Sequence, residues 1–81
     1  MKTIALQRKP YRVYVGVSPG KRRVVEDALN SLEGKLLPPD EGGWDFLLEV
    51  GVPDICSAAS LLQERVMPIN GITRVMLIPP R

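Results

Sequence analysis

The sequence predicts a small α+β domain whose elements follow one another in the order β-α-β-β-α-β. Apolar residues alternate with period two in several segments, which is typical of strands that pack one face against a core. In two other segments they recur at helical spacing, and turns rich in glycine and proline separate the segments. The chain has 81 residues, fewer than the ~150 of an average domain, so it forms a single domain at most.

The first strand and the first helix belong to the N-terminal half. Residues 11–17 alternate between β-branched or aromatic residues and others, which predicts a strand. We expect Ser18 to cap a helix that has Pro19 in its first turn. This helix should extend to about Leu32 and stop at Gly34, because its apolar residues form one stripe. The stripe consists of Val24, Val25, Ala28, Leu29 and Leu32.

The second half supplies two strands, a helix and a last strand. A short edge strand is expected at residues 35–37, because the two prolines that follow cannot donate hydrogen bonds to a sheet. Residues 40–43 form a turn, and residues 44–50 form a strand. One face of that strand carries Trp44, Phe46, Leu48 and Val50. Asp54 is expected to cap the second helix, and the last strand covers about residues 72–78.

This order is that of the ferredoxin-like fold, in which two helices cover one face of a four-stranded antiparallel sheet. We assign residues 1–10 to an N-terminal arm and residues 11–81 to the single domain. The second face of such a sheet should be polar in a solitary domain. Apolar candidates for that face are Tyr14, Leu47, Met76 and Ile78, beside Arg12, Glu49 and Arg74, and the pattern leaves open which parity of each strand faces the helices. We therefore expect it to stack against a second copy; the alternative is a set of scattered surface residues.

The composition excludes several functional classes. The chain has no histidine and one cysteine, and its net charge is +2. It therefore cannot form an internal disulfide or a multi-thiolate metal site, and it lacks the commonest general base. We expect no enzyme, no cofactor and no metal, and we expect Cys56 to be a small buried hydrophobic residue. No apolar segment is long enough to span a membrane or to act as a signal peptide, so we expect a cytoplasmic protein.

Two local motifs are candidates for binding. In Gly42-Gly43-Trp44-Asp45, the glycines allow close approach of a ligand, the ring offers apolar contact and the carboxylate can accept from an ammonium. The alternative is a hairpin turn with a chance aspartate. The basic cluster of residues 21–23 lies at the expected helix start and could attract phosphate, but it is also what a solvated helix surface looks like.

The pattern as a whole resembles the ligand-binding RAM domain of the Lrp/AsnC transcription regulators. The resemblance rests on residues 11–20, on the Gly-Gly-Trp-Asp turn with the apolar strand that follows it, and on Asn70-Gly71-Ile72. It implies dimers that stack their sheets and assemble further into rings. It also implies an amino-acid effector bound between dimers near Gly42, Gly43, Trp44 and Asp45. The helix-turn-helix half has no counterpart here, so the resemblance implies a stand-alone module that does not bind DNA directly but pairs with full-length regulators.

Three other functions remain open at this point. The NapD type of signal-peptide-binding chaperone has the same fold, although it favours a Gly-Lys turn where this chain has Trp44-Asp45. A purely structural oligomerisation domain is the second alternative. The third is an enzyme of the dimeric α+β barrel kind, which without histidine would depend on a bound cofactor.

Overall fold

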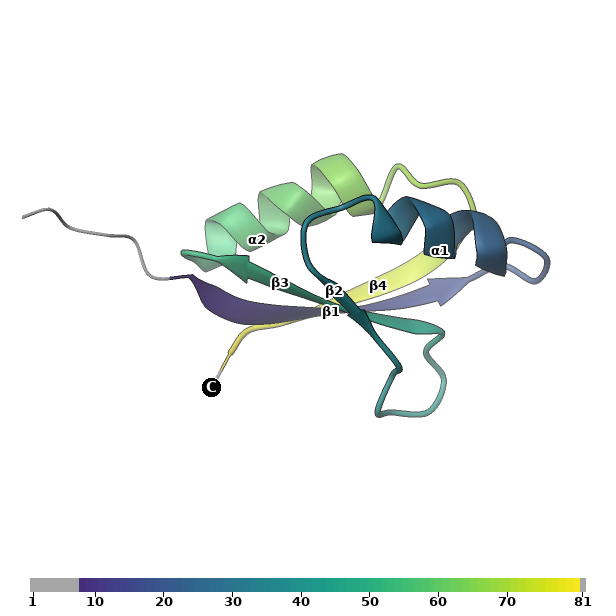
Figure 1. The fold of residues 1–81 in the computed structure, drawn as a ribbon, viewed down its shortest axis with the longest axis horizontal. Helices are drawn as coiled ribbons and strands as arrows, with labels where there is room; N and C mark the ends of the chain where they lie inside the picture. The colour runs from purple at the N-terminus through teal and green to yellow at the C-terminus, as the bar shows by residue number, and fades with distance from the viewer. Residues whose placement is uncertain (1–7, 81) are drawn as a thin grey trace, which may run out of the picture.

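The computed structural model describes residues 8–80 and has the predicted α+β architecture (Figure 1). Residues 1–7 of the expected N-terminal arm lie outside the described residues. The elements in chain order are β1 (Lys9–Val17), α1 (Arg22–Asn30), β2 (Lys35–Leu37), β3 (Phe46–Val52), α2 (Ile55–Leu61), the π-helical turn η1 (Leu62–Val66) and β4 (Ile72–Ile78). The first strand therefore begins two residues before the boundary expected from the alternation.

The four strands form one antiparallel sheet in the order β2-β3-β1-β4. The central strand β1 pairs with β3 on one side and with β4 on the other. In this register Tyr14 lies opposite Leu47 of β3 and opposite Met76 of β4, so these side chains share one face of the sheet. Both helices lie on the other face (Figure 1), which gives the ferredoxin-like arrangement.

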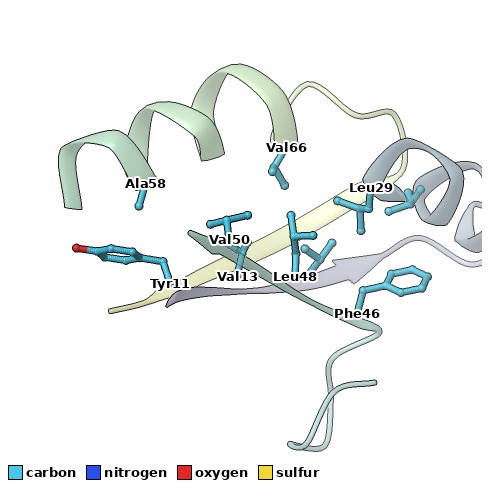
Figure 2. Packing of buried hydrophobic residues seen from close by; sticks show 10 residues of the cluster. Tyr11, Val13, Leu29, Phe46, Leu48, Val50, Ala58 and Val66 are labelled. Atoms are coloured by element: carbon cyan, nitrogen blue, oxygen red, sulfur yellow. The ribbon is translucent and has the colours of Figure 1, made fainter. Parts of the chain in front are cut away.

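The hydrophobic core lies between the sheet and the helices (Figure 2). Alternation along β1 and β3 points every second side chain toward the helices, where the residues are aliphatic or aromatic. The buried members are Tyr11, Val13, Val15, Val25, Leu29, Phe46, Leu48, Val50, Ala58 and Val66. Each large side chain buried in this way contributes about 1.5–3 kcal/mol. This apolar layer packs the helices onto one face of the sheet.

Helix α1 begins later than the sequence indicated. Residues 18–21 form a turn in which the backbone N–H of Lys21 donates to the carbonyl of Ser18 at 3.1 Å. Gly20 has a φ of 85° in this turn, a conformation that glycine adopts without strain. Ser18 therefore closes a turn rather than capping the helix. The shorter helix buries Val25 and Leu29 and leaves Val24 51% exposed, so the predicted apolar stripe was too wide.

The second helix begins as predicted. The backbone N–H of Ser57 donates to the Asp54 carboxylate at 2.8 Å, and this hydrogen bond holds the pKa of Asp54 below its usual value. The π-helical turn η1 that follows brings Val66 into the core. Cys56 is exposed, not buried as expected, because the buried side of α2 is at Ala58. No helix within residues 8–80 is long and apolar enough to cross a membrane.

Candidate functional site

The face of the sheet that carries no helix, which we call the open face, mixes apolar and charged side chains. The predicted members Tyr14, Leu47, Met76 and Ile78 all point to this face, as the strand register requires. The same register places the charged candidates Arg12, Glu49 and Arg74 on this face and adds Gly16. The open face therefore differs in chemistry from the aliphatic face beneath the helices.

The loop between β2 and β3, residues 38–45, lies on the side of the sheet opposite the helices (Figure 1). Several contacts hold it to β1, and two of them involve Tyr14: its hydroxyl donates to Asp40 at 2.5 Å, and its ring lies 5.8 Å from the Trp44 ring, centroid to centroid. Tyr14 is consequently only 2% exposed although no helix covers it. The chain thus covers part of its own open face.

The predicted Gly-Gly-Trp-Asp turn forms one end of this loop. Gly43 has a φ of 88°, so the turn requires a residue without Cβ at this position. Arg74 donates to the Gly43 carbonyl, and its guanidinium lies 4.4 Å from the centre of the Trp44 ring in a cation–π contact. Opposite Arg74 is Gly16, where a Cβ would come within 2.8 Å of the arginine side chain. The absence of a side chain at Gly16 therefore lets Arg74 cross the sheet and hold the turn.

The prediction that Trp44 shares a face with Phe46 was wrong. The strand begins only at Phe46, so alternation does not extend back to Trp44. Trp44 instead contacts Tyr14 and Arg74, both of which belong to the open face. Contacts of Asp45 and Arg74, rather than strand alternation, hold the turn in position.

Asp45 joins the turn to β1 and to α1. One carboxylate oxygen accepts from the backbone N–H of Val17 at 2.9 Å, and the other accepts from Arg22 at 2.9 Å. The backbone N–H of Asp45 donates to the carbonyl of Val15 at 2.9 Å. Both carboxylate oxygens are therefore engaged within the chain. This arrangement lets Asp45 orient the loop, and it also occupies one cation of the basic cluster, Arg22.

A groove of about 780 Å³ opens on the same face, beside the far end of the loop. Among its lining residues are Arg12, Tyr14, Asp40, Glu49, Ile78 and Pro80. The Arg12 guanidinium lies 3.5 Å from Asp40 and 3.9 Å from Glu49. The hydrogen bond between Tyr14 and Asp40 raises the pKa of the tyrosine and, with the nearby Arg12 charge, lowers the pKa of the carboxyl group.

The sequence pattern did not predict this groove. Its charged members come from segments far apart in the chain: Asp40 is 28 residues from Arg12 and 26 residues from Tyr14. The available signal was the pair of charged residues, Arg12 and Glu49, within two otherwise apolar strands. They lie directly opposite each other in the register of β1 and β3. Within residues 8–80, no three Cys, Asp or Glu side chains are grouped so as to hold a metal ion.

The sequence matches no protein-family model, and no curated protein matches it. Solved structures do resemble the chain. FFRP-DM1 superposes with a TM-score of 0.73 at 14% identity, over 86% of this chain and 95% of its own. AsnC from E. coli gives 0.78 at 12% identity, over 96% of this chain and 56% of its own. PF0864 of Pyrococcus furiosus, described as a transcriptional regulatory protein of the AsnC family, gives 0.61 at 18% identity, over 98% of this chain and 58% of its own.

At these identities the likeness establishes a shared fold. The chain spans nearly the whole length of FFRP-DM1, but little more than half of AsnC and of PF0864. The architecture of residues 8–80 is therefore the ferredoxin-like α+β fold that is also present in AsnC-type regulators.

Proposed function

We propose that this chain is a non-enzymatic, RAM-type module that binds a small effector of the amino-acid class and assembles through the open face of its sheet. It would act in the cytoplasm and modulate full-length Lrp/AsnC-type regulators without contacting DNA itself. The fold that it shares with AsnC and PF0864 supports this proposal, as does the residue pattern of the Gly42–Asp45 turn. The observation that carries the proposal is the one-sided packing of the sheet.

When helices cover only one face of a sheet, the other face contacts water and is usually polar, so apolar residues there indicate that something covers them. Leu47 is buried there, and Met76 and Ile78 are partly buried, beside the charges of Arg12 and Glu49. Such a mixture suits an isologous interface, in which an apolar patch meets its own copy. A chain of this size also has a small core, for which association is a common source of added stability.

The turn supports effector binding in the same assembly. Gly42 has open space where a Cβ would be, and both Gly42 and Gly43 are exposed, so their backbone is accessible to a ligand. Arg74 and Trp44 hold this backbone in place through the cation–π contact. A pre-organised turn of this kind lowers the entropic cost of binding. Two sheets stacked face to face would bring the two turns toward a shared interface.

The assembly is tested by analytical ultracentrifugation at high micromolar concentration. We expect a dimer or a larger ring; particles of about the 9.0 kDa chain mass alone would contradict the proposal. Isothermal titration against the twenty amino acids then tests the effector. Silence for all of them, with the oligomer intact, would favour a purely structural oligomerisation domain.

A chaperone of the NapD type would give a different result. The carboxylates of Asp40, Glu41 and Glu49 line the groove and could accept hydrogen bonds from the guanidinium groups of a peptide. A pull-down enriched in twin-arginine precursors would therefore replace the proposed function with peptide binding. Failure to enrich them, together with heat from one amino acid, would support the effector-binding module.

A further inference from the structure

The groove on the open face is lined by cationic, anionic and apolar residues. Lys9 and Arg12 supply two cations, and Tyr14 lines the groove with them. Carboxylates line the groove at Asp40, Glu41 and Glu49. The ends of β1 and β4 add an apolar wall made of Pro10, Ile78, Pro79 and Pro80. Two cations, several anions and an apolar surface are the complement of a molecule that carries a carboxylate, an ammonium group and an apolar side chain.

The ion pairs that Arg12 forms with Asp40 and Glu49 are long. Its ion pairs span 3.5 Å to Asp40 and 3.9 Å to Glu49, whereas a well-formed charge-assisted hydrogen bond spans about 2.7–2.9 Å. The Arg12 side chain is 45% exposed, so its planar donor edge is accessible from the groove. A ligand carboxylate could therefore bind the guanidinium in the bidentate geometry that its present partners do not reach.

The two carboxylates that share Arg12 differ in how firmly they are held. Asp40 accepts from the Tyr14 hydroxyl at 2.5 Å, so it has a second partner that fixes its position. Glu49 has the Arg12 contact at 3.9 Å and lies on β3 directly opposite Arg12. When a ligand takes over the guanidinium, Glu49 becomes available to an ammonium group. Glu41 on the loop provides a second acceptor in the same groove.

We propose that the effector of this module binds in the groove, with its carboxylate on Arg12 and its ammonium on Glu49 and Glu41, rather than on the Gly42–Asp45 turn. This inference rests on the proposed function and changes the location of its site. A volume of about 780 Å³ lies within the range of about 300–1,000 Å³ that is usual for small-molecule sites. A single amino acid would fill only part of it. Because the groove lies on the open face, the second copy of the chain completes it.

The fluorescence of Trp44 can report binding in the groove. Tyr14 lines the groove, bonds to Asp40 and contacts the ring of Trp44. Trp44 is the only tryptophan of the chain. A ligand that displaces Asp40 or Arg12 therefore changes the surroundings of this ring through Tyr14, and tryptophan fluorescence follows the titration.

The decisive experiment uses the full chain and each of the twenty amino acids as probes. For the amino acid that binds, we expect Arg12→Met to weaken the affinity at least tenfold in isothermal titration. The matched control is Arg23→Met, an exposed arginine on α1 outside the groove, which should bind like the wild type. Circular dichroism and ultracentrifugation confirm that both variants keep the fold and the assembly.

Chemical-shift mapping of the wild-type chain gives an independent answer if Arg12→Met fails to fold. We expect the largest amide shifts at Arg12, Glu49 and Ile78. If an amino acid binds but the shifts centre on Gly42 and Gly43, the groove inference is wrong and the proposed function stands. Unchanged affinity of a folded Arg12→Met variant has the same meaning. If none of the twenty produces heat or shifts, both the effector function and this site are overturned.

Discussion

The two faces of the sheet are built from the same strands but by different means. Beneath the helices, β1 and β3 present Val13, Val15, Leu48 and Val50, each at most 2% exposed and packed on aliphatic neighbours. On the open face, the same strands present charged, aromatic and apolar residues, and the cover is a loop held by Asp40 and by Arg74. The helix-covered face is buried by non-directional apolar packing, whereas the open face is partly covered through a few hydrogen bonds and ring contacts of the loop.

Because of this difference, one face of a strand can contribute to the stability of the fold while the other face contributes to binding. Packing of aliphatic side chains is insensitive to partners outside the chain, whereas loosely paired charges such as Arg12 can exchange partners. Because side chains of a strand alternate, β1 serves both purposes with neighbouring residues. Substitutions on the two faces should therefore have different effects: one class should unfold the chain and the other should change what it binds.

The largest expected effect is on the helix-covered face. Leu48→Ala removes a core side chain that is 1% exposed and should lower the free energy of unfolding by about 2–5 kcal/mol, through lost burial and a residual cavity. Urea denaturation followed by circular dichroism measures the change. Val24→Ala is the control because Val24 is 51% exposed, and it should cost less than about 0.5 kcal/mol. Equal losses for both would mean that the core is not where the structure places it.

The next effect belongs to the open face and concerns assembly. Met76→Glu places a carboxylate in the middle of the proposed interface, and the dissociation constant of the dimer should rise by about tenfold or more, since a large apolar contact of about 1.5–3 kcal/mol is lost. Ultracentrifugation over a concentration series measures it. Met67→Glu is the matched control because Met67 follows η1 and is already 54% exposed. Dimers weakened equally by both changes would place the interface elsewhere.

The sequence predicted the covered face well. Alternation in residues 11–17 and 44–50 identified the strands to within two residues at each end, and period-two spacing needs no information from distant segments. The start of α1 was misplaced because Ser18 and Pro19 are as typical of a turn as of a helix N-terminus. Only the positive φ of Gly20 and the hydrogen bond from Lys21 to Ser18 decide between the two.

The open face was predicted in outline only. Its apolar members were named as candidates, but the strand pairing of the structure was needed to decide which parity faces the helices, and the way that the loop folds back over β1 was not predicted. That geometry depends on contacts between residues distant in the chain, such as Tyr14 with Asp40 and Gly16 with Arg74. A local pattern carries no signal for such pairs. The Gly-Gly-Trp-Asp turn was found because its composition is unusual, whereas the groove beside it was not.

A smaller effect is expected where Arg74 crosses the sheet. Gly16→Ala puts a Cβ within 2.8 Å of Cγ and Nε of Arg74, which should displace the guanidinium from Trp44 and cost about 1 kcal/mol as the cation–π contact is lost. The emission of the single tryptophan reports the displacement, and urea denaturation reports the cost. Gly51→Ala is the control, since a Cβ there meets Arg8 at an ordinary 3.5 Å. Unchanged emission in Gly16→Ala would separate Arg74 from the turn.

The smallest effect should come from the contact between Tyr14 and Asp40, and it depends on pH. The pKa of Asp40 is lowered from 3.8 in the folded chain, first by the Tyr14 hydrogen bond. The contribution of this contact is therefore complete above pH 3.8 and is lost as the pH falls through the lower, folded-state value. Tyr14→Phe should lower the urea midpoint at neutral pH, and its difference from the wild type should shrink in acid.

Tyr11→Phe serves as the control for this pH series. Tyr11 lies in the core on the opposite face, and no hydrogen bond joins its hydroxyl to a carboxylate among residues 8–80. Its difference from the wild type should therefore stay constant across the acid range. The pKa of Tyr14 is raised from 10.0 by the same contact, so the wild-type advantage should also decline as the pH rises beyond 10.0. A Tyr14→Phe difference that is flat across the acid range would show that the loop is held to β1 by Trp44 and Arg74 without the Asp40 contact.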